Sequence, residues 1–206
     1  MDASERWLRL TRRAAACLGH LGLRIGEVWR LKLRDVDRSI EGQVLVRRSK
    51  RGVTRRVPWR PFPDAWRQYV VEYVTEVERR WPERGLDGAL FVRESGEPFP
   101  RPADIARLIV PELRSVVGDW VTFHALRTAG ANLLMALGYD VRTIALRLGH
   151  ASVWSTLWYL HLLDALPWRQ LRPMGPGITS AELALLGDMS QRTARRRLRA
   201  RVPAGR

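Results

Sequence analysis

Toward its C-terminal end the chain reads Leu148-Gly-His150 and then Thr156-Leu-Trp-Tyr-Leu-His161, so that a tyrosine follows a histidine by nine positions. Upstream, Phe123-His-Ala-Leu-Arg127 contributes a second histidine and an arginine. Farther upstream lie Gly22-Leu-Arg-Ile-Gly-Glu27, with another arginine, and Ser49-Lys-Arg-Gly52, with one of only two lysines in the chain. Six polar side chains able to handle phosphate or protons therefore occur in a fixed order: Arg24, Lys50, His124, Arg127, His150 and Tyr159.

The composition is that of a folded, strongly basic protein. Its 206 residues suit one domain, or one domain with a small appendage, and an apolar content of 46% excludes a disordered chain. The net charge of +15 indicates a polyanionic partner, most simply nucleic acid, although an RNA or ribosomal binder would carry a similar charge. Because only two of the 36 basic residues are lysines, a single arginine in a motif is weak evidence, whereas the lysines, histidines and tyrosines carry more information.

Several protein classes are excluded by simple features of the chain. A single cysteine, Cys17, excludes a disulfide framework and a cysteine zinc site. The N-terminus is acidic and lacks a long apolar run, which predicts no signal peptide, and no stretch approaches 18 uncharged apolar residues, which predicts no membrane span. We therefore expect a cytoplasmic protein associated with the nucleoid.

The apolar periodicity predicts an α+β fold, mainly helical with a small antiparallel three-stranded sheet. Ser4 is expected to cap a first helix. Leu33 to Val36 is expected to form a first strand, followed by two strands that Ser49-Lys-Arg-Gly52 joins as a hairpin turn. The remaining predictions are strands over 43–48 and 53–58, and helices over 4–19, 24–31, 64–81, 103–117, 124–137, 140–148 and 152–165.

The chain is predicted to divide into a catalytic domain over 1–171 and a linker with a basic tail over 172–206. Arg172-Pro-Met-Gly-Pro-Gly177 breaks the helical pattern and is typical of a linker. An apolar helix over 180–186 and an arginine-rich segment over 192–201 suggest a helix-turn-helix-like unit. Contact with DNA, docking on a neighbouring subunit and a disordered end all remain open for this tail.

The six ordered side chains meet the requirements for breaking a DNA phosphodiester without a metal. Such a reaction needs a nucleophile, cations for the charge on the non-bridging oxygens, and an acid for the departing oxygen. Tyr159, Arg24 with Arg127, and Lys50 can fill these roles, and His124 and His150 can bind the phosphate and manage the tyrosine proton. Lys50 is notable among arginines because a general acid needs a pKa nearer neutrality than arginine can reach.

Each motif alone also has a purely structural interpretation. His124 and Arg127, one turn apart, would usually be a solvated helix face, and Arg24 with Glu27 an ordinary helix pair. Lys50 would be a soluble turn residue, and Tyr159, surrounded by apolar residues, a core or interface aromatic. The combination of all the motifs, in order, favours the functional interpretation.

This combination resembles the tyrosine recombinases, also called the phage-integrase family. The first box of that family is matched by Gly22 to Val28 and continues through Leu31-Lys-Leu-Arg-Asp-Val-Asp37. Its lysine lies in a β-hairpin turn, as Lys50 is predicted to do. Its second box, the Leu-Gly-His motif and the terminal motif are matched by His124-Ala-Leu-Arg-Thr-Ala-Gly-Ala-Asn-Leu133, Leu148-Gly-His150 and Thr156-Leu-Trp-Tyr-Leu-His161.

The resemblance implies the DNA breaking-rejoining catalytic fold over about 1–165. It implies that Arg24, Lys50, His124, Arg127 and His150 form a phosphate pocket in which Tyr159 attacks, giving a 3′-phosphotyrosyl link and a free 5′-hydroxyl. A 5′-hydroxyl from a second duplex would reseal the strand, with no cofactor, metal or ATP. The implied partner is double-stranded DNA, bound by a homotetramer. Arginines beside the hairpin turn and in the tail are candidate DNA contacts: Arg47, Arg48, Arg51, Arg195, Arg196 and Arg197.

The chain departs from the family pattern in two respects. Most members carry a helical N-terminal domain that clamps DNA, and Arg24 comes too early in this sequence for one, so an accessory DNA-bending or clamp protein is a further expected partner. Thr128 stands where the family often has a second histidine. The alternative function is therefore a DNA-binding protein that does not cleave, either a degenerate recombinase or a regulator.

Overall fold

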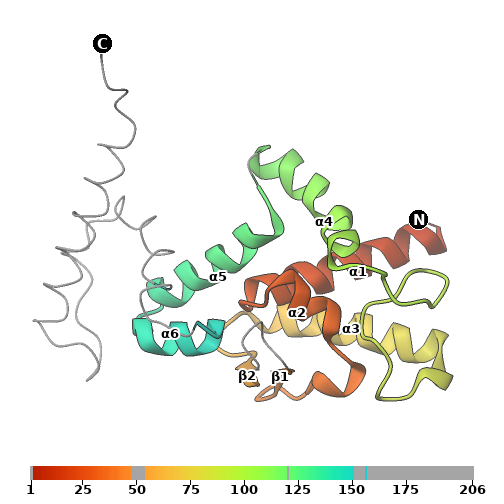
Figure 1. Ribbon diagram of the computed structural model, residues 1–206, viewed down its shortest axis with the longest axis horizontal. Coiled ribbons are helices and arrows are strands. Elements are labelled where there is room, and N and C mark those ends of the chain that lie inside the picture. Colours follow the sequence, from red (N-terminus) through yellow and green to blue (C-terminus); the bar gives the residue numbers. More distant parts are fainter. Residues whose placement is uncertain (1, 48–53, 120, 151–155, 157–206) are drawn as a thin grey trace, which may run out of the picture.

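Helices predominate in the computed structural model, which describes residues 2–47, 54–119, 121–150 and 156 (Figure 1). The predicted α+β class with mainly helical content is confirmed. In this part of the chain no helix is long and apolar enough to cross a membrane. The elements follow in the order α1 (Ala3–His20), α2 (Ile25–Arg30), the 3-10 helix η1 (Leu33–Asp35), β1 (Gln43–Val46), β2 (Arg55–Pro58), α3 (Asp64–Arg80), the 3-10 helix η2 (Pro82–Arg84), α4 (Pro102–Val117), α5 (Phe123–Ala136) and α6 (Val141–Leu148).

The first helix begins one residue earlier than predicted, and its cap is Asp2 rather than Ser4. The Asp2 carboxylate accepts a hydrogen bond from the backbone N–H of Glu5 at 2.7 Å. Ser4 lies inside the helix, and its hydroxyl donates to Glu94 at 2.7 Å. A carboxylate at the N-cap satisfies an otherwise unpaired N–H and also interacts well with the positive end of the helix dipole.

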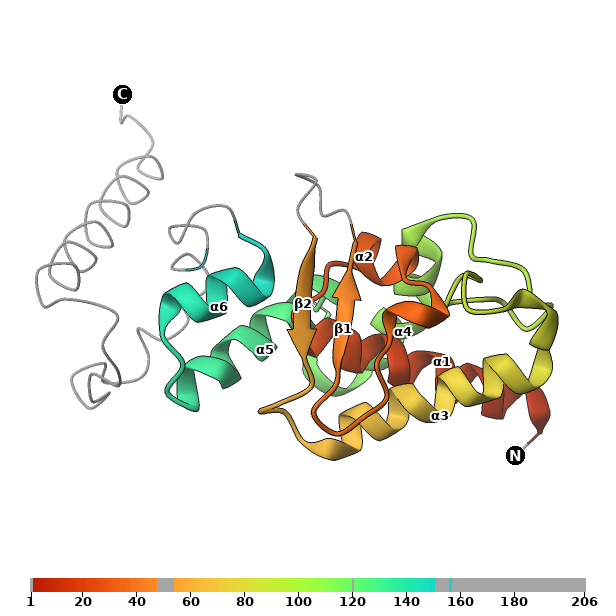
Figure 2. The ribbon, with the colours of Figure 1, turned by 90° about the horizontal axis from the view of Figure 1, so that it is seen from below.

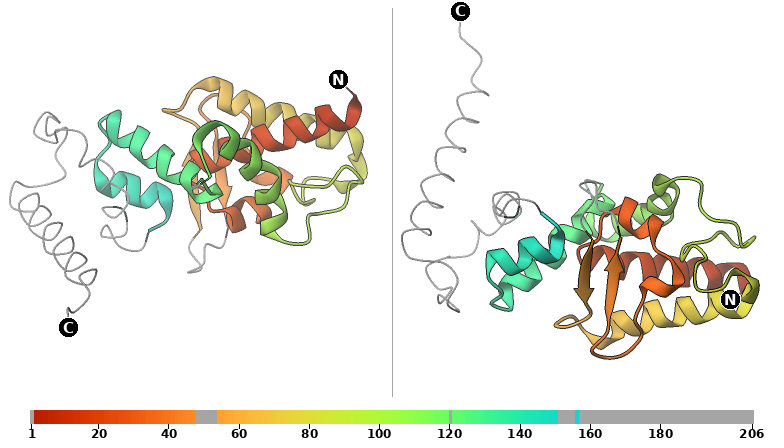
Figure 3. Two further views of the ribbon diagram at one scale, coloured as in Figure 1. Left: turned by 90° about the horizontal axis from the view of Figure 1, so that it is seen from above. Right: turned by 60° about the horizontal axis from the view of Figure 1, so that its bottom comes forward.

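Helix α1 is central to the packing of the other helices. It contacts α3 along one side and α5 near its C-terminal end, as both views in Figure 3 show. Its apolar stripe is buried as the periodicity predicts, with Trp7, Leu10, Ala14 and Leu18 no more than 4% exposed. Burial of this stripe, rather than helix propensity alone, fixes α1 in place.

The close approach of α5 to the end of α1 depends on Gly130. A Cβ atom at this position would lie 1.8 Å from the backbone oxygen of His20. Only glycine therefore fits where these two backbones meet. The contact brings the preceding turn of α5, which carries Arg127, against the segment that follows α1.

The sheet has two strands in the described part of the chain, and the prediction of a third strand is wrong. Strands β1 and β2 are antiparallel, with Val44 opposite Val57 and Val46 opposite Arg55. The predicted first strand is instead the 3-10 helix η1, followed by an isolated bridge between Val36 and Val44.

The reason for this turn lies in Asp35. Its carboxylate, 2% exposed, accepts a hydrogen bond from the backbone N–H of Lys32 at 3.1 Å and another from Arg47 Nε at 2.6 Å. A side chain that bonds the backbone three residues upstream favours a tight turn over an extended strand.

The hairpin lies between α2 on one side and α6 on the other, with α5 behind it (Figure 2). Residues that are distant in sequence, on α2, β2, α5 and the end of α6, therefore meet in one region. The predicted hairpin turn at 49–52 and the tail lie outside the described residues. Of the predicted helix over 152–165, the structure describes only Thr156, which is helical and buried.

Candidate active site

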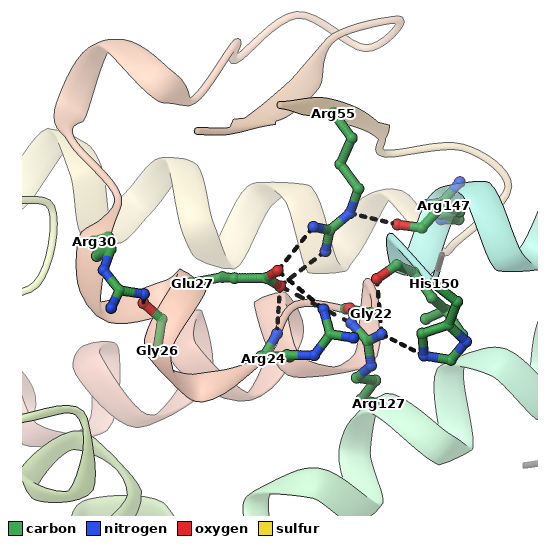
Figure 4. Close-up of polar contacts among 10 residues, drawn as sticks. Gly22, Arg24, Gly26, Glu27, Arg30, Arg55, Arg127, Arg147 and His150 are labelled. Carbon is green, nitrogen blue, oxygen red and sulfur yellow. Dashed lines mark hydrogen bonds and ion pairs between the residues drawn. The ribbon is translucent and has the colours of Figure 1, made fainter. Parts of the chain in front are cut away.

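Arg127 joins three segments of the chain. Its side chain is fully buried and donates to the backbone oxygens of Gly22 and of Leu148, the latter at 2.7 Å. The same guanidinium donates to Nε2 of His150 at 2.8 Å (Figure 4). The arginine predicted from the His-x-x-Arg spacing is therefore not on a solvated helix face, because it is buried and its two terminal nitrogens donate to backbone oxygens and to an imidazole.

The contact with Arg127 defines the protonation of His150. A guanidinium can only donate, so Nε2 of His150 accepts and carries no proton. The proton of the neutral ring is then on Nδ1, which donates to the Thr156 hydroxyl at 2.8 Å. Burial, followed by the charges of Arg127, Arg24 and Arg55 and by His124, lowers the pKa of His150 to about 4.

Arg24 stands at the start of α2 rather than within it. Its backbone N–H donates to the Glu27 carboxylate at 2.8 Å, and its guanidinium contacts the same carboxylate at 3.2 Å. The side chain is 34% exposed, in contrast to the buried Arg127. Arg24 therefore presents a fixed positive charge at the surface of the site.

Glu27 is the buried counter-charge of this region. Its side chain is 3% exposed and receives a two-pronged contact from Arg55, with both distances 2.8 Å. Arg127 lies 3.9 Å from it. Burial alone would raise the pKa of Glu27, but the bonds and charge of Arg55, together with Arg24, lower it below the ordinary value. The carboxylate therefore stays ionised and holds the guanidinium groups together.

Sequence reasoning missed Arg55, although a signal for it exists. On β2 the buried positions alternate, so that Arg55 shares the inward face with Val57. An arginine in phase with a buried valine on a strand indicates a buried partner of opposite charge. In a chain so rich in arginine, that signal was hard to separate from the background.

His124 lies at the N-terminal end of α5, one turn before Arg127, and is exposed. Partial desolvation and the positive charges of Arg127 and Arg24 lower the pKa of His124. The structure thus brings Arg24, Arg127 and His150 together and places His124 within reach of their charges.

The other predicted site residues divide into two groups. Arg47 is described, and its side chain, 46% exposed, is bound to the buried Asp35. The remaining residues lie outside the described part of the chain: Lys50, Tyr159, Arg48, Arg51, Arg195, Arg196 and Arg197.

We expect the free energy of unfolding to fall as the pH is lowered from about 7 to about 5. The folded-state pKa of His150 lies below the ordinary 6.5, and those of His20 and His124 are also lowered, so the unfolded chain binds more protons in this window. Because the imidazole of His150 is only partly buried, we expect its share to be roughly 1 kcal/mol. Urea unfolding at both pH values measures the loss, and His150→Asn should reduce it. Equal stability at both values would contradict the assignment of neutral, desolvated histidines.

The chain with this helical fold and buried cluster of arginine and histidine belongs to the phage integrase family, whose model matches residues 1–165. The tyrosine recombinase XerC of Bradyrhizobium diazoefficiens is 39% identical over 163 residues, which cover 77% of this chain and 48% of that protein. The chain thus spans about half the length of the curated relatives it matches.

Two solved structures show the shared fold. The crystal structure of XerA recombinase has a TM-score of 0.66 and 28% identity, over 85% of this chain and 65% of that one. The XerH site-specific recombinase, bound to a difH substrate before cleavage, has a TM-score of 0.60 and 21% identity, over 82% of this chain and 49% of that one.

Proposed function

We propose that this chain is a site-specific DNA recombinase, which cleaves and rejoins DNA strands through a 3′-phosphotyrosyl intermediate. The observation that carries the proposal is the contact between Arg127 and His150. Arg24 lies beside this contact, and both arginines face the same buried carboxylate, that of Glu27. These residues come from three separate segments of the sequence. Membership of the phage integrase family, and a relative named tyrosine recombinase XerC, support the same activity.

The chemistry follows from the charges of the site. In the proposed first step the phenolic oxygen of Tyr159 attacks the scissile phosphorus, its proton passes to the neutral imidazole of His124, and the bond to the 5′-oxygen breaks. Arg24 and Arg127 stabilise the negative charge that builds on the non-bridging oxygens. Lys50 gives its proton to the departing 5′-oxygen. The covalent link conserves the bond energy, so a 5′-hydroxyl can displace the tyrosine and reseal the strand.

His150 suits the orientation of Arg127. With a pKa lowered to about 4 it is neutral at physiological pH, and its neutral imidazole accepts the hydrogen bond from Arg127 through Nε2. Its ring is fixed from both sides, by Arg127 and by Thr156. Because the ring is already oriented, no conformational entropy is lost in orienting it during the reaction.

Double-stranded DNA is the proposed partner, and the net charge of +15 supports it. The XerH structure, a neighbour in fold, is of a recombinase bound to its difH substrate. We further propose a homotetramer on two DNA sites, with an accessory DNA-bending or clamp protein, and a nucleoid location. The division into a catalytic domain over 1–171 and a basic tail over 172–206 belongs to the same proposal.

The test is covalent capture of DNA. The protein is incubated with nicked duplexes carrying candidate sites, so that cleavage releases a short strand and rejoining is prevented. We expect a protein–DNA adduct that survives denaturing electrophoresis and disappears after protease treatment. Binding without any adduct would favour the non-cleaving alternative. Salt dependence cannot separate the two, because both would show a log-log slope of about −0.9 per phosphate neutralised.

A further inference from the structure

Arg55 occupies the last described pair of the hairpin, on the side toward the predicted turn with Lys50. It is the first residue of β2 and pairs with Val46 on β1. Its side chain points inward and is only 7% exposed. An arginine in this position can connect the stem of the hairpin to the residues that its guanidinium contacts.

The guanidinium of Arg55 binds two parts of the site at once. Both terminal nitrogens donate to the Glu27 carboxylate at 2.8 Å, and Nε donates to the backbone oxygen of Arg147 at 2.8 Å. Each of its three nitrogens therefore has a protein acceptor, as Figure 4 shows. Arg55 differs in this respect from the partly exposed Arg24, because each of its nitrogens is already bonded within the protein.

Arg55 also packs against the backbone that leads into His150. Gly149 ends α6 in the left-handed region, with φ +65°. A Cβ atom there would lie 2.8 Å from a terminal nitrogen of Arg55 and 3.0 Å from its central carbon. The glycine thus serves both the helix end and the close approach of the guanidinium.

We propose that Arg55 is a positioning residue, which locks the hairpin stem, the Glu27–Arg24 pair and the Gly149–His150 backbone into one arrangement. This inference rests on the proposed function and deepens it: in the proposed reaction Lys50, predicted to lie in the hairpin turn, and His150, after α6, act on the same phosphate. Arg55 belongs to the hairpin stem, and its buried guanidinium contacts the backbone that leads into His150. Small displacements of such groups cost large factors in rate.

The charges around His150 give this role a spectroscopic signature. The groups that act on its ring are Arg127 and His124 from α5, Arg24 before α2, and Arg55 from β2. Loss of the Arg55 charge removes one repulsion of the imidazolium and leaves Glu27 less compensated. Both effects act in the same direction, so the pKa of His150 should rise toward its ordinary value.

Arg67 offers a matched control on α3, the helix that follows the hairpin. It donates to both oxygens of Asp64, at 2.7 and 3.2 Å, and to the backbone oxygen of Arg38 at 2.6 Å. Its side chain is 14% exposed. It therefore has the same set of partners as Arg55, one carboxylate and one backbone carbonyl, but it lies on α3, and neither Asp64 nor Arg38 is a site residue.

The experiment compares Arg55→Met, Arg55→Lys and Arg67→Met with the wild-type chain. Imidazole ¹⁵N titration of His150 is measured without DNA, and the rate of adduct formation is measured at saturating nicked duplex. We expect Arg55→Met to raise the pKa of His150 and to slow cleavage by about 100-fold, with DNA affinity unchanged. Arg55→Lys should keep the pKa of His150 near that of the wild type, because lysine retains the positive charge. It should still cleave slowly, because an ammonium group cannot make the two-pronged contact with Glu27. Arg67→Met should match the wild type in both.

The inference would be overturned by an unchanged pKa of His150 in Arg55→Met, or by cleavage in Arg55→Lys as fast as in Arg67→Met. If Arg55→Met does not fold, the cleavage rate of Arg55→Lys decides. If the wild-type protein does not cleave DNA at all, the proposed function fails. The titration needs no DNA, so an unchanged pKa of His150 in Arg55→Met would overturn the inference in that case as well.

Discussion

Replacement of Tyr159 by phenylalanine is expected to abolish covalent capture of nicked DNA and to leave non-covalent binding intact. The substitution removes one oxygen atom, the proposed nucleophile, and no other group of the site can form a phosphotyrosyl bond. Binding depends instead on the basic residues that neutralise DNA phosphates, and these are unchanged.

The measurement pairs a denaturing gel, which reports the adduct, with a mobility-shift titration, which reports affinity. Tyr139 provides the matched control, because it is a tyrosine that follows α5 and lies outside the matched motifs, and Tyr139→Phe should still form the adduct. Adduct formation by Tyr159→Phe at the wild-type level would remove Tyr159 from the mechanism.

Arg24→Ala and Arg127→Ala are expected to slow cleavage by a similar amount but to differ in their effect on folding. Loss of one donor to a developing negative charge costs about 3–4 kcal/mol of transition-state stabilisation, and we expect this for either arginine. Arg24 is 34% exposed, so its removal should change the free energy of unfolding little.

Arg127 is different because it is fully buried and bound to backbone. Its removal leaves the carbonyl oxygens of Gly22 and Leu148 without this donor and opens a cavity. We therefore expect Arg127→Ala to lower the free energy of unfolding by about 3–5 kcal/mol. Arg79→Ala, which removes an arginine 66% exposed from a pair with Glu76, is the control and should cost less than about 1 kcal/mol. Denaturant unfolding measures all three variants, and equal stability of Arg24→Ala and Arg127→Ala would contradict the structural role of Arg127.

The sequence allowed the helices to be predicted well, because long apolar stripes such as that of α1 are strong signals. Short elements are governed by single side chains instead. The segment 33–36 has the apolar content of a strand, but the carboxylate of Asp35 bonds the backbone of Lys32 and closes a 3-10 turn. Asp2, rather than Ser4, caps α1 for a similarly local reason. Neither the 3-10 turn at Asp35 nor the cap at Asp2 can be recognised from the hydrophobic pattern.

In the site, too, some features could be predicted from the sequence and others could not. Arg24, Arg127 and His150 lie together, as the ordered motifs predict. The buried pair of Glu27 and Arg55, which supports them, was missed because burial of a charged side chain is decided by its partner in space. Periodicity shows which face a residue occupies, but not which residue of another element it meets. Lys50 and Tyr159, outside the described residues, stay predictions from the sequence.

Identification of the amino acid that becomes linked to DNA tests the central claim most directly. The adduct formed on nicked duplex is digested with protease and nuclease, and the nucleotide-bearing peptide is sequenced by mass spectrometry. The account predicts one modified peptide, with the 3′-phosphate of the cleaved strand on the phenolic oxygen of Tyr159. A nucleotide attached to any other residue, or a cleaved strand ending in a free 3′-phosphate with no peptide attached, would contradict it.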